Sequence, residues 1–435
     1  MERRVCKPIY GGMFAVADGE NRAFVLPGEH LRAIPEGLAG LEALEPAVGR
    51  VTPRCLHFGV CGGCQYQHAD YEVQLGIKQQ ILAELLDETE LGALPAITLV
   101  AGPPWGYRNR IRMRIHARPG EAVEFGYSLA ASNTFLPVTM CPIAAPVLWR
   151  GIEALGGVAR TEPKLRGWFA EALEVELFTD GEEKAVQVQL FLGSAGGEVQ
   201  QPAAFEAFAR ALKANLPELT GMGAGLAPEL SRRTRRGWAG ARWGADGLGY
   251  VVHDREYWVR RGAFFQVNRF LVDDLVRVVL SEAGRSGALA WDLFAGVGLF
   301  SLPLAERFGQ VVAVEGGAES AADLLAAARG IPALEAVRMP VLEFLRRQMT
   351  QRDRPELVVL DPPRAGLGAE SSALLGRLAP PRIVYVSCDP VTLARDLKVL
   401  VSTGYEVCSV HLIDLFPQTF HMETVVRLER EGGAH

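Results

Sequence analysis

Cys388 is the residue of this chain whose position most favours nucleophilic chemistry. It follows an apolar run at 382–387 that is typical of a β-strand, and Asp389 and Pro390 after it are typical of a helix start. A helix N-terminus lowers the pKa of a thiol from its usual value of about 8.5 and favours the thiolate. We therefore expect a reactive thiol here, although the local sequence alone leaves a buried structural cysteine equally open.

Other side chains could exchange protons with a substrate near such a thiol. Glu423 directly precedes a predicted terminal strand at 424–428 and is the candidate general base, with His421 as its rival. Asp361 ends another apolar run and is followed by two prolines and an arginine, which predicts a rigid loop. Because ligands of open α/β sheets bind at the carboxyl ends of the strands, we expect Asp361 and Cys388 at one site.

A glycine turn between a strand and a helix predicts a site for a ligand that contains a ribose. The apolar run 288–294 leads into Gly296 and Gly298, and glycines there let the backbone approach a ligand closely. Glu315 ends the next apolar run, where a carboxylate can accept hydrogen bonds from both ribose hydroxyls. Ser301 replaces the third glycine of the usual dinucleotide motif, which argues against a nicotinamide dehydrogenase.

A compact cysteine-rich loop indicates a metal centre. Cys55, Cys61 and Cys64 are close in sequence, and two glycines between the last two permit tight curvature. Cys141 is the best candidate for a fourth ligand. Four thiolates suit either an iron–sulfur cluster or zinc, and the spacing does not choose between them. The alternative is a set of free thiols that hold no metal.

Strand and helix signals divide the chain into three regions. Residues 1–50 contain turn signals and a short predicted strand at 23–26, which indicates small β structure. A helix is predicted over 71–87, and the middle region continues to about residue 250 with several strand-like runs. From about residue 264, strands alternate with helices, which predicts βα units and a parallel sheet. These predicted strands lie at 288–294, 310–315, 356–360 and 382–387.

Arginines gather in two short segments although the chain is acidic overall. The formal net charge of −6 argues weakly against a nucleic-acid partner. However, residues 105–118 and 231–242 each hold five arginines and no acid. In the first segment a strand would place four arginines on one face, namely Arg108, Arg110, Arg112 and Arg114. Such a face suits nucleic-acid phosphates, and the alternative is a solvated strand edge.

The composition is that of a globular protein in a reducing compartment. Of the 435 residues, 49% are hydrophobic and 22% are charged. No apolar run reaches the roughly 18 residues that a membrane helix needs, and the first residues do not resemble a secretory signal. The seven cysteines are an odd number, which favours metal binding or catalysis over disulfides. We expect a monomeric cytoplasmic protein without a membrane partner.

These features together resemble the RNA 5-methyluridine methyltransferases, specifically the iron–sulfur branch that modifies 23S ribosomal RNA. The resemblance covers nearly the whole chain. It rests on the cysteine loop Cys55 to His68 with Tyr71, Gln74 and Lys78, and on further motifs. These are Tyr107-Arg108-Asn109-Arg110, Cys141-Pro142-Ile143, Phe264-Phe265-Gln266-Val267-Asn268, Asp361-Pro362-Pro363-Arg364, Ser387-Cys388-Asp389-Pro390 and Phe416-Pro417-Gln418-Thr419 ending in Glu423.

The resemblance implies methyl transfer from S-adenosylmethionine to carbon 5 of a uridine in 23S rRNA. Cys388 would add to carbon 6 of the ring, and Glu423 would remove the proton from carbon 5. The family also implies that a [4Fe–4S] cluster, rather than zinc, is held by Cys55, Cys61, Cys64 and Cys141. The cofactor residues would be Gln266, Phe294, Glu315 and Asp361, together with the turn at Gly296 and Gly298.

The implied fold is a multidomain α/β protein. Residues 1–50 would form a shortened TRAM-like β-barrel, and 51–255 an α+β central domain that carries the cluster loop and the RNA-binding surface. Residues 256–435 would form a Rossmann-like S-adenosylmethionine-dependent methyltransferase domain.

The chain departs from the family pattern at residues 127–133, where a basic stretch is often found, and at three single positions. Pro340 stands where the cofactor site usually has Asn or Asp, Leu299 where Asn is common, and Asp389 where Asn usually follows the catalytic cysteine. Two alternatives therefore stay open: the same chemistry on tRNA, and an RNA-binding protein with weak or no catalytic activity.

Overall fold

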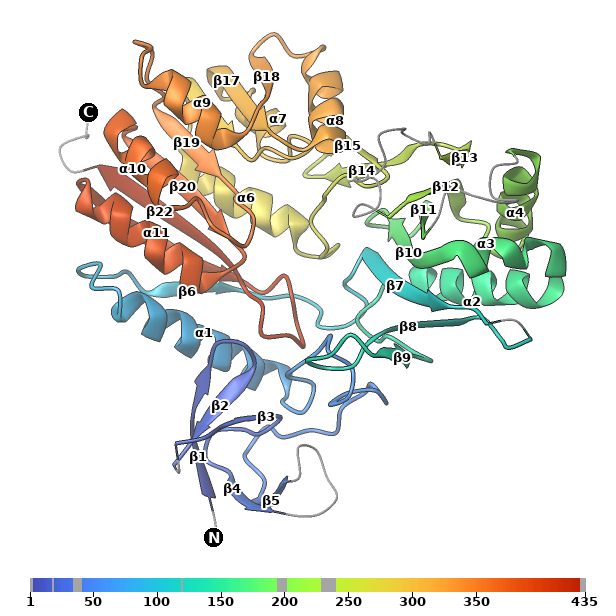
Figure 1. Cartoon of the computed structure of the whole chain (residues 1–435). Coiled ribbons are helices and arrows are strands. Elements are labelled where there is room, and N and C mark those ends of the chain that lie inside the picture. Colours follow the sequence, from blue (N-terminus) through green and yellow to red (C-terminus); the bar gives the residue numbers. More distant parts are fainter. Residues whose placement is uncertain are drawn as a thin grey trace.

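A computed structural model describes residues 3–17, 19–33, 41–118, 120–193, 202–227 and 240–430. Most of the second arginine-rich segment, 231–239, lies outside these residues. Four sheets organise the described chain, and Figure 1 shows them as an N-terminal sheet, a central part and a C-terminal α/β part. Within the described residues, no helix has the length and apolar character needed to cross a membrane.

The C-terminal α/β part contains an eight-stranded sheet with the order β18-β17-β16-β19-β20-β22-β21-β6. Strands β16 to β20 pair in parallel, whereas β22 runs antiparallel to both β20 and β21. The strands are β16 (Gly287–Leu293), β17 (Phe308–Glu315), β18 (Leu334–Arg338), β19 (Leu357–Leu360), β20 (Arg382–Ser387), β21 (Tyr405–Ile413) and β22 (Glu423–Arg430). The predicted parallel arrangement is thus confirmed, with one antiparallel insertion.

Helices cover both faces of this sheet. They are α6 (Val272–Ala283), α7 (Ser301–Leu304), α8 (Ala318–Ala328), α9 (Val341–Gln348), α10 (Ala369–Leu378) and α11 (Pro390–Ser402). Every residue of β19 is buried, as expected for a strand that is covered on both faces. The eighth strand, β6 (Ile97–Val100), comes from the region before the central sheet and pairs in parallel with β21.

The helix α1 (Tyr71–Asp87) confirms the helix predicted at these residues. Its apolar side packs with the N-terminal sheet and with one face of the C-terminal sheet in a single continuous core, which includes Phe14, Leu82 and Leu397. In Figure 1, α1 and β6 lie between the N-terminal sheet and the C-terminal part. The N-terminal sheet is therefore held directly against the domain that carries the predicted nucleophile.

The N-terminal sheet has five antiparallel strands in the order β3-β2-β1-β4-β5. They are β1 (Arg3–Ile9), β2 (Met13–Val16), β3 (Asn21–Ala23), β4 (His30–Ala33) and β5 (Leu41–Glu45). This confirms small β structure at the N-terminus. The strand predicted at 23–26 is wrong in its position, because Phe24 has a φ of 62° and ends β3.

The central sheet has seven strands in the order β13-β12-β11-β10-β7-β8-β9. They are β7 (Arg110–His116), β8 (Glu124–Ser128), β9 (Phe135–Pro137), β10 (Ala172–Thr179), β11 (Val186–Leu192), β12 (Leu219–Leu226) and β13 (Ala241–Gly244). The helices α2 (Pro146–Thr161), α3 (Arg166–Glu171) and α4 (Pro202–Asn215) share an apolar core with it. A hairpin of β14 (Gly247–Val252) and β15 (Arg255–Arg260) packs against α6 in a separate core.

Candidate active site

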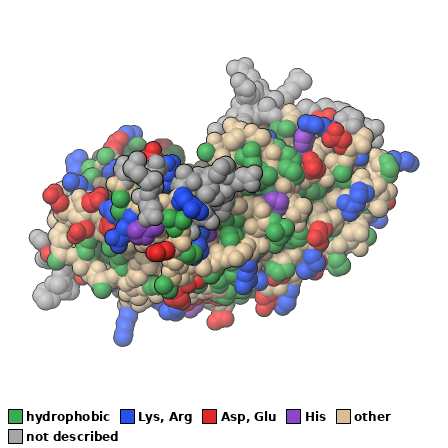
Figure 2. Space-filling view, turned by 90° about the horizontal axis from the view of Figure 1, so that it is seen from below, with side chains coloured by type: hydrophobic (Ala, Val, Ile, Leu, Met, Phe, Trp, Pro, Cys, Tyr) green, Lys and Arg blue, Asp and Glu red, His purple; other side chains and the backbone are tan. Residues whose placement is uncertain are grey.

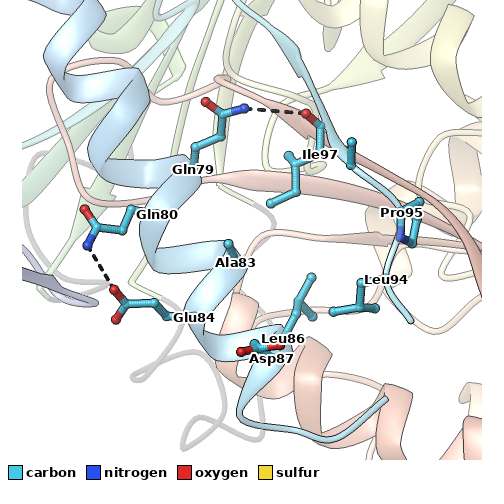
Figure 3. Close-up of a pocket in the computed structure, with 10 residues that line it drawn as sticks. Gln79, Gln80, Ala83, Glu84, Leu86, Asp87, Leu94, Pro95 and Ile97 are labelled. Carbon is cyan, nitrogen blue, oxygen red and sulfur yellow. Dashed lines mark hydrogen bonds between the residues drawn. The ribbon is translucent and has the colours of Figure 1, made fainter. Parts of the chain in front are cut away.

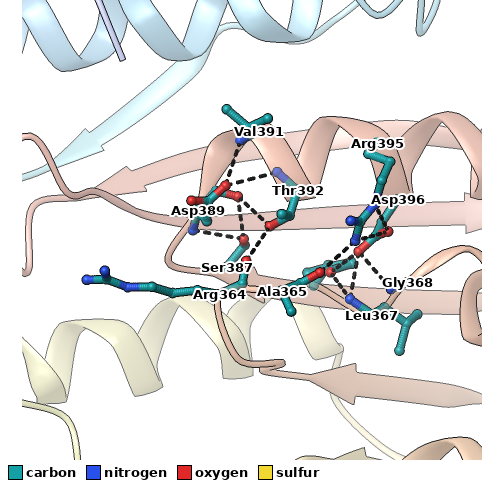
Figure 4. Close-up of polar contacts among 11 residues, drawn as sticks. Arg364, Ala365, Leu367, Gly368, Ser387, Asp389, Val391, Thr392, Arg395 and Asp396 are labelled. Carbon is teal, nitrogen blue, oxygen red and sulfur yellow. Dashed lines mark hydrogen bonds and ion pairs between the residues drawn. The ribbon is translucent and has the colours of Figure 1, made fainter. Parts of the chain in front are cut away.

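Cys388 lies at the junction between β20 and α11, as the sequence predicts. Asp389 is the N-cap of α11, and its Oδ1 accepts hydrogen bonds from the backbone N–H groups of Val391 (3.1 Å) and Thr392 (3.0 Å). The Ser387 hydroxyl also bonds the backbone of Asp389 at its N–H and carbonyl. Figure 4 shows these contacts gathered at the start of α11. The junction that presents the thiol is therefore fixed on both sides.

The loop after Asp361 is tied to the same helix. The Thr392 hydroxyl donates to the carbonyl of Arg364 at 3.1 Å. Asp396, which is buried in α11, accepts hydrogen bonds from the backbone N–H of Leu367 (2.7 Å) and from the hydroxyl of Tyr385 (2.8 Å). Figure 4 shows both groups of contacts along α11. Because loop and helix share these bonds, Asp361 and Cys388 are held at one edge of the sheet.

The environment of the thiol differs from the expectation based on the helix N-terminus. Burial raises the pKa of Cys388 to about 12, and the negative charges of Glu423 and Asp361 act in the same direction. The positive charge of Arg364 opposes this rise. The direction of the shift is therefore opposite to the expected lowering, and its causes are desolvation first and then the two carboxyls.

Glu423 is a buried acid at the start of β22, with 2% of its surface exposed. It pairs in the sheet with Ile413. Its Oε1 has no hydrogen-bond partner among the residues that the structure describes. Burial and the nearby Asp361 raise the pKa of Glu423 well above its usual value. A carboxyl with a raised pKa and a free oxygen is suited to proton exchange with a substrate.

His421, the rival base, has a different environment. Its ring nitrogen Nε2 lies 3.1 Å from Nη2 of Arg364, and the ring lies against Phe420. Burial and the charge of Arg364 lower the pKa of His421 to about 4. The imidazole is thus neutral near pH 7 but weakly basic. A carboxylate whose pKa is raised is the stronger base of the two.

The glycine turn after β16 adopts the conformation that the sequence predicts. Phe294, Gly296 and Gly298 all have positive φ, of 63°, 58° and 95°. The N–H of Gly296 donates to Oε2 of Glu315 at 2.9 Å, and the N–H of Gly317 donates to the other carboxylate oxygen. The acid at the end of β17 therefore lies directly beside the turn.

Gln266 and Asp361 also meet at this edge. The Gln266 side-chain amide donates to Oδ2 of Asp361, with 3.2 Å between the two atoms. Burial and the neighbouring Asp292 raise the pKa of Asp361 to about 7, while the hydrogen bond from Gln266 acts against the rise. The four predicted cofactor residues thus divide into two contacts, Gln266 with Asp361 and the Phe294 turn with Glu315.

Asp292 belongs to this cluster and was missed by the sequence analysis. It lies in β16, is fully buried, and accepts a hydrogen bond from the hydroxyl of Ser301. Burial raises its pKa to about 7. The signal was present in the sequence, since an acid interrupts an otherwise apolar strand.

Two positions that depart from the family pattern also lie in this domain. Pro340 is the N-cap of α9 without a side-chain hydrogen bond, and Leu299 is buried.

The loop that precedes Glu423 is held by residues far away in the sequence. Gln74 and Gln418 form two hydrogen bonds with each other. The Gln74 side-chain amide donates to the side-chain oxygen of Gln418 at 3.1 Å, and the backbone N–H of Gln418 donates to the side-chain oxygen of Gln74 at 2.9 Å. The hydroxyl of Tyr107 donates to the carbonyl of Pro417 at 3.0 Å. The backbone N–H groups of Gln65 and Tyr66 both donate to the carbonyl of Gln418. The cysteine loop and α1 therefore position the approach to Glu423.

A buried ion pair reinforces this arrangement. Nζ of Lys78 lies 2.6 Å from Oδ1 of Asp414, and both side chains are inaccessible to solvent. Lys78 also donates to the carbonyl of Phe416 at 3.0 Å. Removing one partner of a buried ion pair costs about 3–5 kcal/mol, because the other charge is left unpaired. The sequence motif contained Lys78, but nothing in the sequence predicted its partner.

The four predicted metal-binding cysteines gather in one region. Burial raises the pKa of Cys64 to about 12, and the charges of Cys141, Cys61 and Cys55 add to the rise. All four are free cysteines. As the side chains stand, however, no group of three or more Cys, His, Asp or Glu residues in the described parts of the chain could hold a metal ion. The thiols are neighbours without forming a ready-made metal site.

The arginines in and next to strand β7 differ in their partners: some are paired with acids and others are not. Arg110 is largely buried, pairs with Glu176 at 3.4 Å and donates to the carbonyl of Ala263. Arg112 donates to Glu174 at 2.7 Å. Arg114 donates to the carbonyl of Asn133 at 2.7 Å, and the described contacts give it no acidic partner. Arg108 has a buried Nε without a described partner and lies near Cys141. The four arginines therefore do not form a uniform, free basic face.

A separate hollow lies elsewhere and offers less chemistry. It has a volume of about 650 Å³ and lies between α1 and the start of β6, lined by Gln79, Glu84, Leu86, Leu94 and Ile97 among others. Figure 3 shows apolar side chains and two glutamines around it, with Gln79 bonded to the Ile97 carbonyl. It contains neither a cysteine nor a histidine, so the edge that carries Cys388 is the better candidate site.

Comparison with known proteins identifies relatives over most of the chain. The family model described as tRNA (Uracil-5-)-methyltransferase matches residues 249–431. The 23S rRNA (uracil(1939)-C(5))-methyltransferase RlmD of Salmonella paratyphi A is 32% identical over 392 residues, which cover 88% of this chain and 82% of the relative. The corresponding RlmD of Alkalilimnicola ehrlichii is 32% identical over 440 residues, covering 94% and 91%.

The fold also matches a solved structure. The crystal structure of Pyrococcus abyssi tRNA (uracil-54, C5)-methyltransferase in complex with S-adenosyl-L-homocysteine superposes with a TM-score of 0.71. The match covers 98% of this chain and 99% of that chain at 21% identity, so it supports the fold alone. Together with the relatives that are 32% identical, these findings show that the chain belongs to the S-adenosylmethionine-dependent RNA uracil-C5-methyltransferase family.

Proposed function

We propose that this enzyme methylates carbon 5 of a uridine in 23S rRNA, with Cys388 as the nucleophile and Glu423 as the general base. The convergence of Cys388, Glu423 and Asp361 in one electrostatically linked cluster, in which Glu423 is buried and the other two are half-buried, carries the proposal. The choice of 23S rRNA is supported by the RlmD relatives, which resemble this chain over most of its length. A catalytically silent RNA-binding protein would have no use for a buried base beside a thiol.

Cys388 supplies the activation that uracil lacks. Carbon 5 of uracil is a poor nucleophile, but addition of a thiolate to carbon 6 moves ring electrons to O4 and makes carbon 5 reactive. Since the pKa of the free thiol is raised, its proton is released to solvent as the substrate binds, before the sulfur adds to carbon 6. Arg364 is the group whose charge favours the thiolate.

Glu423 completes the reaction. Because its pKa is raised, Glu423 first releases its own proton to solvent. After carbon 5 has received the methyl group, the Glu423 carboxylate takes the proton of carbon 5, the bond between sulfur and carbon 6 breaks, and the thiolate leaves. Its raised pKa makes it a better proton acceptor than His421, whose pKa is lowered. We therefore assign His421 no proton transfer.

The donor site is proposed at the adjoining edge of the sheet. S-adenosylmethionine supplies the electrophilic methyl group there. Glu315 would accept the ribose hydroxyls, and the Phe294 turn, with Gly296 and Gly298, would let the backbone approach the ligand. Gln266 and Asp361, which already bond each other, would fix the polar end of the donor near Cys388.

We also propose the RNA-binding and domain roles implied by the resemblance. The β7 face with Arg110, Arg112 and Arg114, together with Arg108 just before the strand, would contact phosphates, with Arg114 the best available for it. Residues 1–50, as a TRAM-like barrel, and the central domain at 51–255 would present RNA to the methyltransferase domain at 256–435. Figure 2 shows basic and acidic side chains interspersed on one face, without a broad basic patch on that face.

We further propose that Cys55, Cys61, Cys64 and Cys141 hold a [4Fe–4S] cluster once it is inserted. Four free thiols in one electrostatic neighbourhood are the donor set such a cluster takes, although the side chains must draw closer to hold it. Anaerobic purification followed by iron and sulfide analysis tests this. Wild-type protein and Cys408→Ser should contain both elements, and Cys64→Ser should lose them. Zinc alone at full occupancy would contradict the proposal.

Methylation assays on separate RNAs test the proposed function. With isotopically labelled donor, we expect 5-methyluridine in 23S rRNA transcripts and none in tRNA. Incorporation into tRNA alone would overturn the target while leaving the chemistry intact. Donor binding without incorporation into either RNA would contradict the proposed reaction.

A further inference from the structure

The tip of the N-terminal hairpin reaches the proposed nucleophile. The turn between β1 and β2 consists of Tyr10, Gly11 and Gly12. Tyr10 in this turn contacts Asp389, which lies 379 positions later in the chain. The hydroxyl of Tyr10 donates to Oδ2 of Asp389, with 3.0 Å between the oxygens. Asp389 directly follows Cys388. A small β-sheet expected to bind RNA thus contacts the catalytic junction itself.

The Asp389 carboxylate is divided between two tasks. Oδ1 accepts the first N–H groups of α11, those of Val391 and Thr392. Oδ2 accepts the Tyr10 hydroxyl. The helix cap therefore restrains one oxygen and the hairpin restrains the other. Burial and the charge of Asp389 raise the pKa of Tyr10, so its hydroxyl stays protonated and remains a donor.

Further contacts hold the hairpin tip in place. The Tyr10 ring packs edge-on against Phe420, with 5.3 Å between ring centroids. Gly12 has a φ of 81°, and a Cβ there would lie 2.7 Å from Cγ of Gln65. Phe420 in turn donates its N–H to the Gln65 side chain at 3.4 Å. The tip is therefore wedged between the cysteine loop, the segment before Glu423 and the Cys388 junction.

We propose that Tyr10 is a positioning residue for methyl transfer, which holds the Asp389 carboxylate and so fixes the junction that presents the Cys388 thiol. This inference rests on the proposed function, because it takes Cys388 as the nucleophile. It gives the N-terminal sheet a part in the chemical step in addition to RNA binding. Tyr10 acts through Asp389 and does not need to touch the reacting atoms.

The position of the thiol matters because several charged groups act on it at short range. Glu423 from β22, Asp361 and Arg364 from the loop after β19, and Asp389 itself all act on Cys388. A carboxylate that loses its donor is free to turn about its side chain and to change its distance from the sulfur. Hydrogen bonds to charged groups are roughly twice as strong as neutral ones, so this restraint is not easily replaced by water.

Tyr10→Phe tests the proposal because it removes the hydroxyl and keeps the ring on Phe420. We expect kcat for RNA methylation to fall about tenfold, which corresponds to about 1.4 kcal/mol, while KM for RNA stays unchanged. The matched control is Tyr405→Phe. Tyr405 is the first residue of β21, and its hydroxyl donates to the carbonyl of Pro380. It lies at the opposite end of β21 from Ile413, which pairs with Glu423. This control should keep the wild-type kcat.

Asp389→Ser tests the route through Asp389. Serine is also a good N-cap, but its short side chain cannot cap α11 and reach Tyr10 at once. We expect this variant to lose about as much kcat as Tyr10→Phe, and the double variant to lose no more than either single variant. It also carries the test if Tyr10→Phe proves unstable in thermal melting.

Three outcomes would overturn the inference. They are a wild-type kcat for Tyr10→Phe, a change confined to KM for RNA, and a further loss of kcat when Tyr10→Phe is added to Asp389→Ser. Failure of the proposed function gives a different result, because Cys388→Ala would then retain turnover. A further measurement addresses the addition step itself. It compares the rate of RNA adduct formation in Glu423→Gln with the rate in the double variant that also carries Tyr10→Phe. An unchanged rate also speaks against Tyr10.

Discussion

The side-chain amide of Gln266 donates to the Asp361 carboxylate across 3.2 Å and thereby joins the segment before α6 to the end of β19. Both residues lie at the edge where the methyl donor is proposed to bind. The contact restrains Asp361, a half-buried acid whose pKa is raised to about 7. The donor site is therefore partly organised before the donor binds.

Gln266→Ala should weaken donor binding because it removes both a polar contact and the restraint on Asp361. We expect the Kd for S-adenosylmethionine, measured by calorimetry, to rise about tenfold, as for the loss of about one hydrogen bond to a charged group. Gln80→Ala is the control, since Gln80 is an exposed residue of α1 that bonds Glu84. Equal affinities for the two variants would contradict the proposed donor site.

Cys388→Ala and Glu423→Gln should fail at different steps. Without the thiol no addition to carbon 6 occurs, so turnover should fall by at least about a thousandfold. Without the base, addition and methylation proceed but carbon 5 keeps its proton, so turnover should fall about 10²–10⁴-fold while a covalent RNA adduct accumulates. Denaturing gels with labelled RNA measure both effects.

The corresponding controls use residues outside the site. Cys408→Ala changes a cysteine of β21 and should keep turnover, and Glu406→Gln in the same strand should form no lasting adduct. An RNA adduct that persists in Cys388→Ala would refute the assignment of the nucleophile.

Asp361 should make stability depend on pH. Burial and Asp292 raise its folded-state pKa to about 7 from a usual value near 4. Its contribution is fully present below about pH 4, where both states are protonated, and is lost as the pH rises through about 7. The side chain introduced by Asp361→Asn stays neutral at every pH. As the pH rises from about 4 to about 7, the melting temperature of this variant should therefore increase relative to that of wild type. Asp87→Asn, at an exposed position, is the control. A constant difference between wild type and Asp361→Asn across this range would contradict the raised pKa.

The sequence predicted the sheet better than the electrostatics of the site. Strand periodicity placed β16, β17, β19 and β20 to within a few residues, because apolar runs and glycine turns are local signals. The N-cap at Asp389 followed from residue type alone. The raised pKa of Cys388 did not, because it arises from burial in the tertiary fold and from Glu423 and Asp361, which come from other segments of the chain.

Contacts between distant segments explain what else could not be predicted. The strand β6 completes the C-terminal sheet although it precedes the central sheet in the chain. Lys78 finds Asp414 only after α1 has docked on that sheet. Likewise, the alternation of arginines in β7 was correctly predicted. The acids that form ion pairs with Arg110 and Arg112 lie on β10, however, and local spacing does not reveal them. Local spacing indicates which face a side chain shares, and the tertiary fold decides its partner.

That difference among the arginines gives a prediction for RNA binding. Arg114 has no acidic partner among its described contacts, whereas Arg112 is paired with Glu174 and covers the Phe191 ring. A phosphate can therefore recruit Arg114 without breaking an ion pair. Arg114→Ala should weaken RNA binding about tenfold and reduce the slope of log K against log salt by about one. Arg112→Ala is the matched variant from the same strand and should change both quantities less. Filter binding at several salt concentrations measures these effects, and a larger loss for Arg112→Ala would show that the β10 acids do not decide which arginines contact RNA.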